Sequence, residues 1–154
     1  MDDVGVTKAC IGASLAVCLL VSGCGGVEQD VFTDRVVEDA LSTSDHFDGG
    51  TYYQAFRVIA RTTGEGIINM EGQACEENCN GATLIDTQLY VKRPNGADVV
   101  EDNDSGGGND ARVRFHVDAG DEFRVVATTH VGSQTGRFRL TVSENLKIID
   151  RLNH

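Results

Sequence analysis

Residues 85–117 constrain the fold more than any other stretch of the chain. In this stretch, IDTQLYVKRPNGADVVEDNDSGGGNDARVRFHV, a segment of alternating apolar and polar residues precedes a Pro-Asn-Gly turn at residues 94–96. A short apolar segment, an acidic glycine-rich loop and a second alternating segment follow. Alternation is the side-chain period of a β-strand with one buried face, and Pro-Asn-Gly favours a tight turn between paired strands. The stretch therefore predicts three antiparallel strands.

Similar short segments recur along the rest of the chain, separated by turn residues. The 154 residues include 18 glycines and one proline, which favours many tight turns between short elements. A chain of this length forms one domain and is too short for two well-buried cores. The sequence therefore predicts an all-β fold, an antiparallel β-sandwich. Its expected strands are residues 52–61, 67–70, 83–93, 97–100, 111–117, 122–128 and 137–142.

The first 24 residues have the pattern of a targeting segment. Lys8 precedes an apolar run over residues 9–20, which is short for a membrane-spanning helix and typical of a signal peptide. The residues LVSGC, which end at Cys24, resemble the lipobox of bacterial lipoproteins. This resemblance implies that residues 1–23 are cleaved off and that the Cys24 thiol carries a diacylglycerol. A secretory signal without lipidation and an uncleaved membrane anchor are the alternatives.

The expected location of the protein and its net charge limit the classes of molecule that it binds. Gly25 follows the cysteine where an aspartate would retain Gram-negative lipoproteins in the inner membrane, so the resemblance implies a cell-envelope protein anchored in the outer membrane. The formal net charge of −11 repels phosphate backbones and anionic headgroups, so the sequence predicts no nucleic-acid partner. The lipid is therefore the expected contact with the membrane.

Two cysteines remain once the leader and the lipidated residue are set aside. Cys10 and Cys18 belong to the leader, which leaves Cys75 and Cys79 in the sequence CEENC. Outside the cytoplasm such a pair is expected to form a disulfide. A metal site is the alternative, although zinc takes four ligands and the chain has no second pair at ligand spacing.

Both ends of the predicted sandwich are less regular. Residues 24–47 are expected to form a tether, in which a short helix capped by Thr33 or Asp34 is the alternative. The apolar residues at helical spacing are Phe32, Val36, Val37, Ala40 and Leu41. Residues 144–154 form either a tail, a final strand or a short helix, and their pattern does not distinguish these.

Residues 48–143 resemble the bacterial pre-peptidase C-terminal domain, a jelly-roll module of many secreted proteases that is related to collagen-binding domains. The match is carried by GTYY at 50–53, DTQLYV at 86–91 with the turn at 94–96, EDND at 101–104 and GRFRLTV at 136–142. The resemblance implies a jelly-roll-like sandwich that binds a protein or polysaccharide.

The acidic loop at residues 101–110 is a candidate calcium-binding site. Ca²⁺ takes six to eight oxygen ligands, and glycines allow a loop to wrap around it. The loop does not follow the EF-hand pattern, because Val113 stands where a bidentate Glu is needed. Some collagen-binding relatives of the pre-peptidase C-terminal domain use calcium, so the resemblance favours a calcium site in this loop. The alternative is an acidic loop that is solvated and holds no metal ion. The candidate ligands are Asp86, Glu101, Asp102, Asp104 and Asp110.

The sequence predicts no enzyme. Its four histidines are scattered, and no serine stands in a nucleophile elbow. The expected function is a lipid-anchored binding module, and the alternative is a structural or accessory lipoprotein of an envelope complex or of secreted proteases. Tyrosine and arginine suit interface contacts. The candidate binding residues are Tyr53, Arg57, Arg112, Arg114, Arg137 and Arg139.

Overall fold

The computed structural model of the protein describes residues 31–74 and 85–152. This part of the chain is built from strands, turns and loops, and it contains no helix that is long and apolar enough to cross a membrane. The strands are β1 (Val31–Phe32), β2 (Val36–Leu41), β3 (His46–Asp48), β4 (Thr51–Ala60), β5 (Gly64–Gln73), β6 (Thr87–Lys92), β7 (Asp98–Asp102), β8 (Ala111–Val117), β9 (Glu122–Thr129), β10 (Gly136–Val142) and β11 (Leu146–Arg151).

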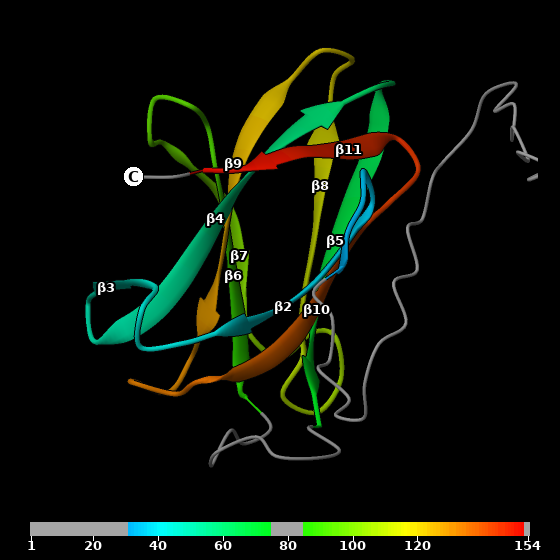
Figure 1. Cartoon of the computed structure of the whole chain (residues 1–154). Helices are drawn as coiled ribbons and strands as arrows, with labels where there is room; N and C mark the ends of the chain where they lie inside the picture. Colours follow the sequence, from blue (N-terminus) through cyan, green and yellow to red (C-terminus); the bar gives the residue numbers. More distant parts are fainter. Residues whose placement is uncertain (1–30, 75–84, 153–154) are drawn as a thin grey trace, which may run out of the picture.

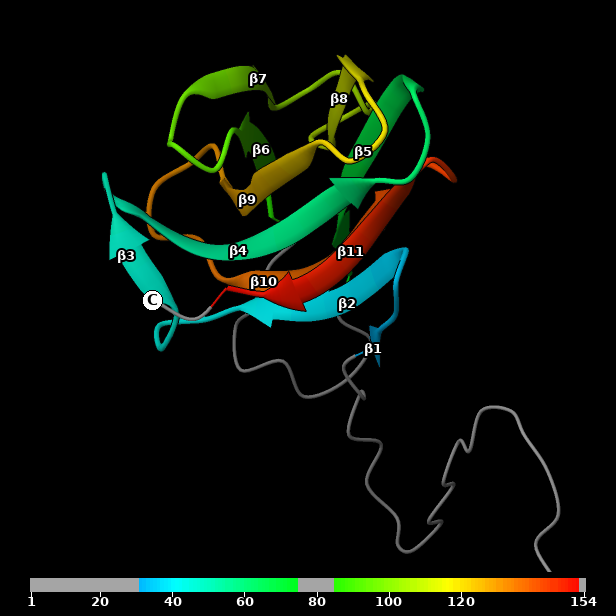
Figure 2. The same ribbon diagram turned by 90° about the horizontal axis from the view of Figure 1, so that it is seen from above.

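The strands form two sheets that pack face to face (Figure 1, Figure 2). One sheet, which we call the β10 sheet after its central strand, has the order β1-β2-β10-β5-β8. The other, the β9 sheet, has the order β11-β4-β9-β6-β7, and the short β3 pairs with β4. The pairings between neighbouring strands are antiparallel. The predicted all-β antiparallel sandwich is therefore confirmed.

The strand order is that of a jelly roll. Consecutive strands from β4 to β6 and from β7 to β10 lie in alternate sheets, whereas β6 and β7 form a hairpin within the β9 sheet. The two halves β2-β10-β5-β8 and β4-β9-β6-β7 are the arrangement that results from two successive Greek keys. The predicted turn at residues 94–96 connects β6 to β7, with Gly96 at a φ of 87°. The amide of Gly96 donates to the carbonyl of Arg93 at 2.9 Å.

Alternation along the strands fills the space between the sheets with apolar side chains. The core is centred on Phe56 of β4, Phe123 of β9 and Phe138 of β10, all of which are buried. Burying one such ring stabilises the fold by about 2–3 kcal/mol. Leu89 and Val91 of β6 are also buried.

The tether or short helix predicted for residues 24–47 is corrected in its described part, residues 31–47, where residues 36–41 form strand β2. Its side chains Val37 and Leu41 face the core, and β10 pairs with it along its whole length. Thr33, the expected helix cap, accepts a hydrogen bond from the Val36 amide at 2.9 Å in the turn between β1 and β2. The same local hydrogen bond serves a helix cap or a turn. A helix this short is marginal without packing, whereas β10 supplies backbone partners for a strand.

The carboxyl-terminal residues form β11, an edge strand beside β4. The sandwich therefore extends beyond the predicted limits of residues 48–143 at both ends. Figure 2 shows β11 (red) between β4 and β2. Across this side of the sandwich, the buried carboxylate of Asp39 on β2 forms an ion pair with Arg151 on β11. The Arg151 guanidinium also lies 5.9 Å from the centre of the Phe56 ring. The ion pair thus joins the two sheets.

Candidate binding groove

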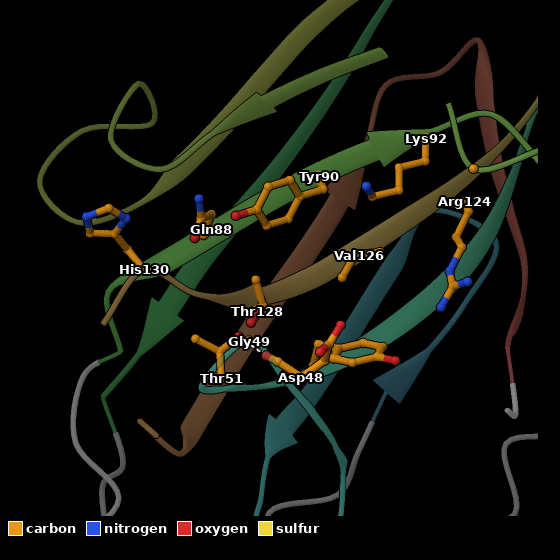
Figure 3. Close-up of a pocket in the computed structure, with 12 residues that line it drawn as sticks. Asp48, Gly49, Thr51, Gln88, Tyr90, Lys92, Arg124, Val126, Thr128 and His130 are labelled. Carbon is orange, nitrogen blue, oxygen red and sulfur yellow. Dashed lines mark hydrogen bonds between the residues drawn. The ribbon is translucent and has the colours of Figure 1, made fainter. Parts of the chain in front are cut away.

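A groove of about 760 Å³ lies on the outer face of the β9 sheet, across strands β4, β9 and β6 (Figure 3). Its floor consists of outward-facing side chains of these three strands, and residues of the β3–β4 and β6–β7 turns also border it. The groove is therefore built on the central part of the sheet. The lining residues are Asp48, Gly49, Thr51, Tyr53, Gln88, Tyr90, Lys92, Gly96, Arg124, Val126, Thr128 and His130.

Strand alternation and register place the groove side chains. Because Leu89 and Val91 of β6 point into the core, the residues on either side of them point outward. Strand β9 alternates in the same way, and its pairing with β6 sets the outward residues side by side. The neighbouring pairs in the groove are Gln88 with Thr128, Tyr90 with Val126, and Lys92 with Arg124.

Three cations lie in one row at one end of the groove region, and we call Lys92, Arg124 and Arg57 the cationic row. Arg124 on β9 is the register partner of Lys92 on β6 and of Arg57 on β4. Lys92 Nζ lies 2.5 Å from Asp98 Oδ1. Arg57 donates to both carboxylate oxygens of Asp150, at 3.2 and 2.8 Å. Figure 3 shows Lys92 and Arg124 at the same end of the groove.

Tyr90 presents an aromatic ring and a neutral phenol to the groove. Burial raises the pKa of the Tyr90 phenol, and the Glu101 and Asp98 carboxylates raise it further, whereas the Lys92 ammonium acts in the opposite direction. The phenol therefore stays protonated at neutral pH and serves as a hydrogen-bond donor. The Lys92 ammonium lies 5.7 Å from the centre of the ring.

Two aromatic pairs support the β3–β4 hairpin, which borders the groove. The rings of His46 and Tyr53 are 5.5 Å apart between centres, and those of Phe47 and Tyr52 are 4.9 Å apart. The Thr128 hydroxyl of β9 donates to the Tyr52 carbonyl at 2.8 Å. These contacts fix Tyr53, one of the predicted binding residues, in the groove wall.

The structure divides the predicted binding residues between two opposite faces. Tyr53 and Arg57 lie on the outer face of the β9 sheet, and the other four predicted binding residues lie on the outer face of the β10 sheet. The six predicted binding residues therefore do not form one surface. On the outer face of the β10 sheet, acidic neighbours offset the arginines, with Glu65 lying 3.5 Å from one of them and Glu38 3.6 Å from another. The four arginines on that face are Arg112, Arg114, Arg137 and Arg139.

The carboxylate of Asp102 in the acidic loop is used to join strands. It accepts hydrogen bonds from the Ser105 amide at 2.9 Å, the Ser105 hydroxyl at 2.5 Å and the Arg112 amide at 2.9 Å. Partial burial by itself raises the pKa of Asp102, but the hydrogen bonds from Arg112 and Ser105 outweigh it and hold the pKa below its usual value. Asp102 therefore connects β7 of one sheet to β8 of the other.

The other predicted calcium ligands are not gathered around Asp102. Asp110 accepts a hydrogen bond from the Gly72 amide at 2.9 Å, and Asp86 interacts through its backbone with Gln134 and His130. Glu101 and Asp104 are exposed. Among residues 31–74 and 85–152, no group of three or more Asp, Glu, His or Cys side chains is arranged to hold a metal ion. Calcium binding stays a prediction.

Three predicted residues lie outside the described parts of the chain. They are Cys24, the expected lipidation site, and Cys75 and Cys79, the expected disulfide. Lipidation and the disulfide therefore stay predictions.

The low pKa of Asp102 predicts a stability that depends on acidity. A carboxyl with a folded pKa below its unfolded value of about 4 stabilises the fold above that pH, and this contribution is lost as the pH falls through the folded pKa. We expect Asp102→Asn to lack this part of the acid-induced loss, measured by urea unfolding between about pH 2.5 and 5. Asp104→Asn, which changes a carboxylate outside this hydrogen-bond set, serves as the control. Equal acid dependence in the wild type and Asp102→Asn would contradict the assignment.

Sequence reasoning identified only Tyr53 among the residues that line this groove. The alternation around Leu89 and Val91 marks which β6 residues face outward, and the turn at residues 94–96 indicates the pairing of β6 with β7, but the sequence carries no signal for the pairing of β6 with β9. Partners of β6 come from β9, more than 30 residues further along the chain. The groove residues that the sequence analysis missed include Gln88, Tyr90, Lys92, Arg124 and Thr128.

Comparison with known proteins gives structural neighbours of low identity. No protein-family model and no curated protein matches the chain. The pre-peptidase C-terminal domain of collagenase from Bacillus anthracis is 13% identical, with a TM-score of 0.48, over 71% of this chain and 89% of that one. Empty particles of Cowpea mosaic virus match at 9% identity with a TM-score of 0.36, over 82% of this chain and 90% of theirs. An empty virus-like particle of the same virus matches at 10% identity with a TM-score of 0.32, over 86% and 89%.

Proposed function

We propose that this protein is a non-catalytic binding module of the bacterial cell envelope, anchored in the outer membrane by a lipid on Cys24, which holds an extended polymer. The groove on the β9 sheet carries this proposal, because it crosses three strands and is lined by aromatic rings, an amide, hydroxyls and cations. Such groups recognise a ligand through stacking and hydrogen bonds. A groove that is open along a sheet suits a chain-like protein or polysaccharide.

The arrangement of the groove suits recognition. Its donors and acceptors are distributed across β4, β9 and β6 instead of converging on one point where a bond would be broken. The central side chains are held by antiparallel pairing on both sides of β9. A floor of this kind presents its binding groups in fixed positions, which lowers the entropy lost on binding.

The lipid anchor is proposed from the lipobox resemblance at residues 20–24. Metabolic labelling with palmitate is expected to mark the wild-type protein in the envelope fraction, and Cys24→Ser to lose the label. Absence of label in the wild type would remove the anchor from the proposal and leave the groove unaffected.

Replacing Tyr90 with alanine is expected to weaken ligand binding by about tenfold, because a stacking ring and a phenol donor are lost from the middle of the groove. The measurement is binding of the purified protein to an array of polysaccharides and extracellular-protein peptides, followed by titration of the polymers that bind. His116→Ala is the control, because His116 is exposed on β8 of the opposite sheet.

Two results would contradict this role of the groove. Equal affinity of the wild type and Tyr90→Ala would place binding elsewhere on the protein. Failure to bind any polymer, together with stable association with an integral envelope protein, would support the accessory-lipoprotein alternative.

A further inference from the structure

The charged side chains of the cationic row already have partners within the protein. Lys92 pairs with Asp98, and Arg57 pairs with Asp150. Arg124 is also engaged in an interaction within the chain. An anionic ligand would have to compete with these contacts. The row therefore gives the groove no preference for an anion.

Carboxylates lie on both sides of the groove. On the β6 side, the Tyr90 phenol lies in the field of the Glu101 and Asp98 carboxylates, and the one ammonium that acts on it is that of Lys92. On the other side, Asp48 lines the groove, and its carboxylate has no hydrogen-bond or ion-pair partner among the described residues. Like charges repel, whereas a free carboxylate accepts hydrogen bonds from hydroxyl groups. These carboxylates favour an uncharged ligand that carries hydroxyls.

The uncharged polar groups on β6 are free to bind a ligand. Gln88 and Tyr90 are half-buried, and neither the Gln88 amide nor the Tyr90 hydroxyl has a hydrogen-bond partner in the described parts of the chain. The amide donates two hydrogen bonds and accepts through its oxygen, and the phenol both donates and accepts. Partly buried polar groups of this kind gain from a ligand that supplies both donors and acceptors.

The ring of Tyr90 provides an aromatic surface beside these groups. Figure 3 shows the ring broadside, over the strands of the groove floor. The Lys92 ammonium lies 5.7 Å from the ring centre, which is beyond a contact distance of about 4 Å. A ring in this position offers its face to a flat, weakly polar surface of a ligand, such as the C–H face of a sugar ring.

Small side chains form the floor between the two sides of the groove. Strand β9 places Val126 beside Tyr90 and Thr128 beside Gln88. Asp48 lies on the other side of β9 from Gln88 and Tyr90 (Figure 3). The groove therefore runs along β9 and is open at its ends, a shape that suits a linear polymer.

The backbone of the groove floor argues against a peptide as the ligand. Adding a peptide strand requires an exposed sheet edge with unpaired N–H and C=O groups. Strands β4, β9 and β6 each have a neighbouring strand on both sides. Recognition in the groove therefore depends on side chains. The described lining is mainly polar, with Val126 as its one aliphatic side chain, so it offers little to the apolar side chains of a peptide.

We infer that the groove binds an uncharged linear polysaccharide, with one sugar ring on the face of Tyr90 and hydroxyl groups of the polymer at Gln88 and Asp48. The inference rests on the proposed function and names the class of its ligand. Sugar hydroxyls both donate and accept, so they satisfy the Gln88 amide and the Asp48 carboxylate together. An acidic polysaccharide offers the same hydroxyls but is repelled by the carboxylates on both sides of the groove.

The test compares uncharged polysaccharides with charged forms of the same backbone. Laminarin, glucomannan, arabinoxylan and galactomannan are titrated against the purified protein, each beside its hydroxyethylated and its carboxymethylated derivative. The two substituents are similar in size, and only the second is charged. We expect at least one native polysaccharide to bind, with an affinity that added salt leaves unchanged. Its carboxymethylated form is expected to bind about tenfold more weakly than its hydroxyethylated form.

Three variants address the groups that are assigned to the sugars. Gln88→Met is expected to weaken binding of the native polysaccharide about tenfold, because it keeps the length of the side chain and removes the amide. Tyr90→Phe, which keeps the ring, is expected to weaken it only a few-fold. Asp48→Asn is expected to weaken the native form a few-fold and to strengthen the carboxymethylated form, because it removes a repelling charge. Gln73→Met makes the same change as Gln88→Met at a half-buried residue of β5 in the opposite sheet and is expected to have no effect. Thermal unfolding confirms that each variant is folded.

The outcomes separate this inference from the proposed function. Preferential binding of a carboxymethylated polymer or of a peptide, lost in Tyr90→Ala, would overturn the uncharged ligand and keep the groove as the site. Binding of an uncharged polysaccharide that is unchanged in both Gln88→Met and Tyr90→Ala would overturn the groove as well. An equal loss in Gln73→Met and Gln88→Met would remove the assignment of the Gln88 amide. No binding to any of the uncharged polysaccharides would also overturn the inference.

Discussion

Replacing Arg151 with methionine is expected to lower the free energy of unfolding by about 3 kcal/mol, because it leaves the Asp39 carboxylate buried without its partner. The side chain of Asp39 is 8% exposed and that of Arg151 is 40% exposed, so the buried charge of this pair is the carboxylate. Methionine keeps most of the length and the packing against Phe56, which restricts the change to the lost ion pair. Urea unfolding at neutral pH measures the effect.

Two further variants show whether the buried charge is the cause. Arg61→Met removes an ion pair with Asp34 in which the side chains are 43% and 48% exposed, so it is expected to cost less than about 1 kcal/mol. Replacing both members of the buried pair, Asp39→Leu with Arg151→Met, is expected to recover most of the loss, since a well-packed apolar pair can substitute for a buried ion pair. Equal costs for Arg151→Met and Arg61→Met would contradict this account.

Thr87→Val is also expected to destabilise the protein by about 3 kcal/mol, because a buried hydroxyl at the start of β6 joins three segments of backbone. The hydroxyl donates to the Met70 carbonyl at 2.9 Å and accepts a hydrogen bond from the Ala111 amide at 2.7 Å. The Thr87 amide donates to the Asn109 carbonyl at 2.9 Å. Valine has the same shape but leaves the buried Ala111 amide without this acceptor.

Matched variants separate the hydrogen bonds from the packing at Thr87. Thr87→Ser keeps the hydroxyl and loses one methyl group, so it is expected to cost about 1 kcal/mol. Thr141→Val makes the same chemical change on the outer face of the β10 sheet, where the hydroxyl accepts from Asn69 at 3.3 Å, and is expected to cost about 0.5 kcal/mol. A larger cost for serine than for valine at Thr87 would show that packing dominates. Urea unfolding of all three variants provides the comparison.

Local patterns predicted much of the sandwich, and they failed where a local signal had two meanings. The alternation around Leu89 and Val91 identified β6 and its buried face, and the Pro-Asn-Gly turn was found in its expected place. By contrast, the segment that follows Thr33 has apolar residues compatible with a helix or a strand. Pairing with β10, about 100 residues away, decided in favour of the strand.

The groove was less predictable than the fold for a related reason. Outward-facing residues such as Tyr90 carry no pattern that distinguishes a binding face from a solvated one. Arginines that look alike in the sequence were divided by the topology, since Arg57 lies in the β9 sheet and Arg139 in the β10 sheet. In the acidic loop, the strand connection made by Asp102 also depends on a residue of another strand, Arg112, which no local pattern identifies.

The fold class, and the residues of most strands that face the core, can be derived from the amino-acid sequence, because both follow from a two-residue period along each strand. The order of the strands in the two sheets follows only from the packed fold, and so do the groove, the cationic row and the ion pair of Asp39 with Arg151. These features join residues far apart in the chain, so they depend on long-range pairing and burial that no local pattern specifies.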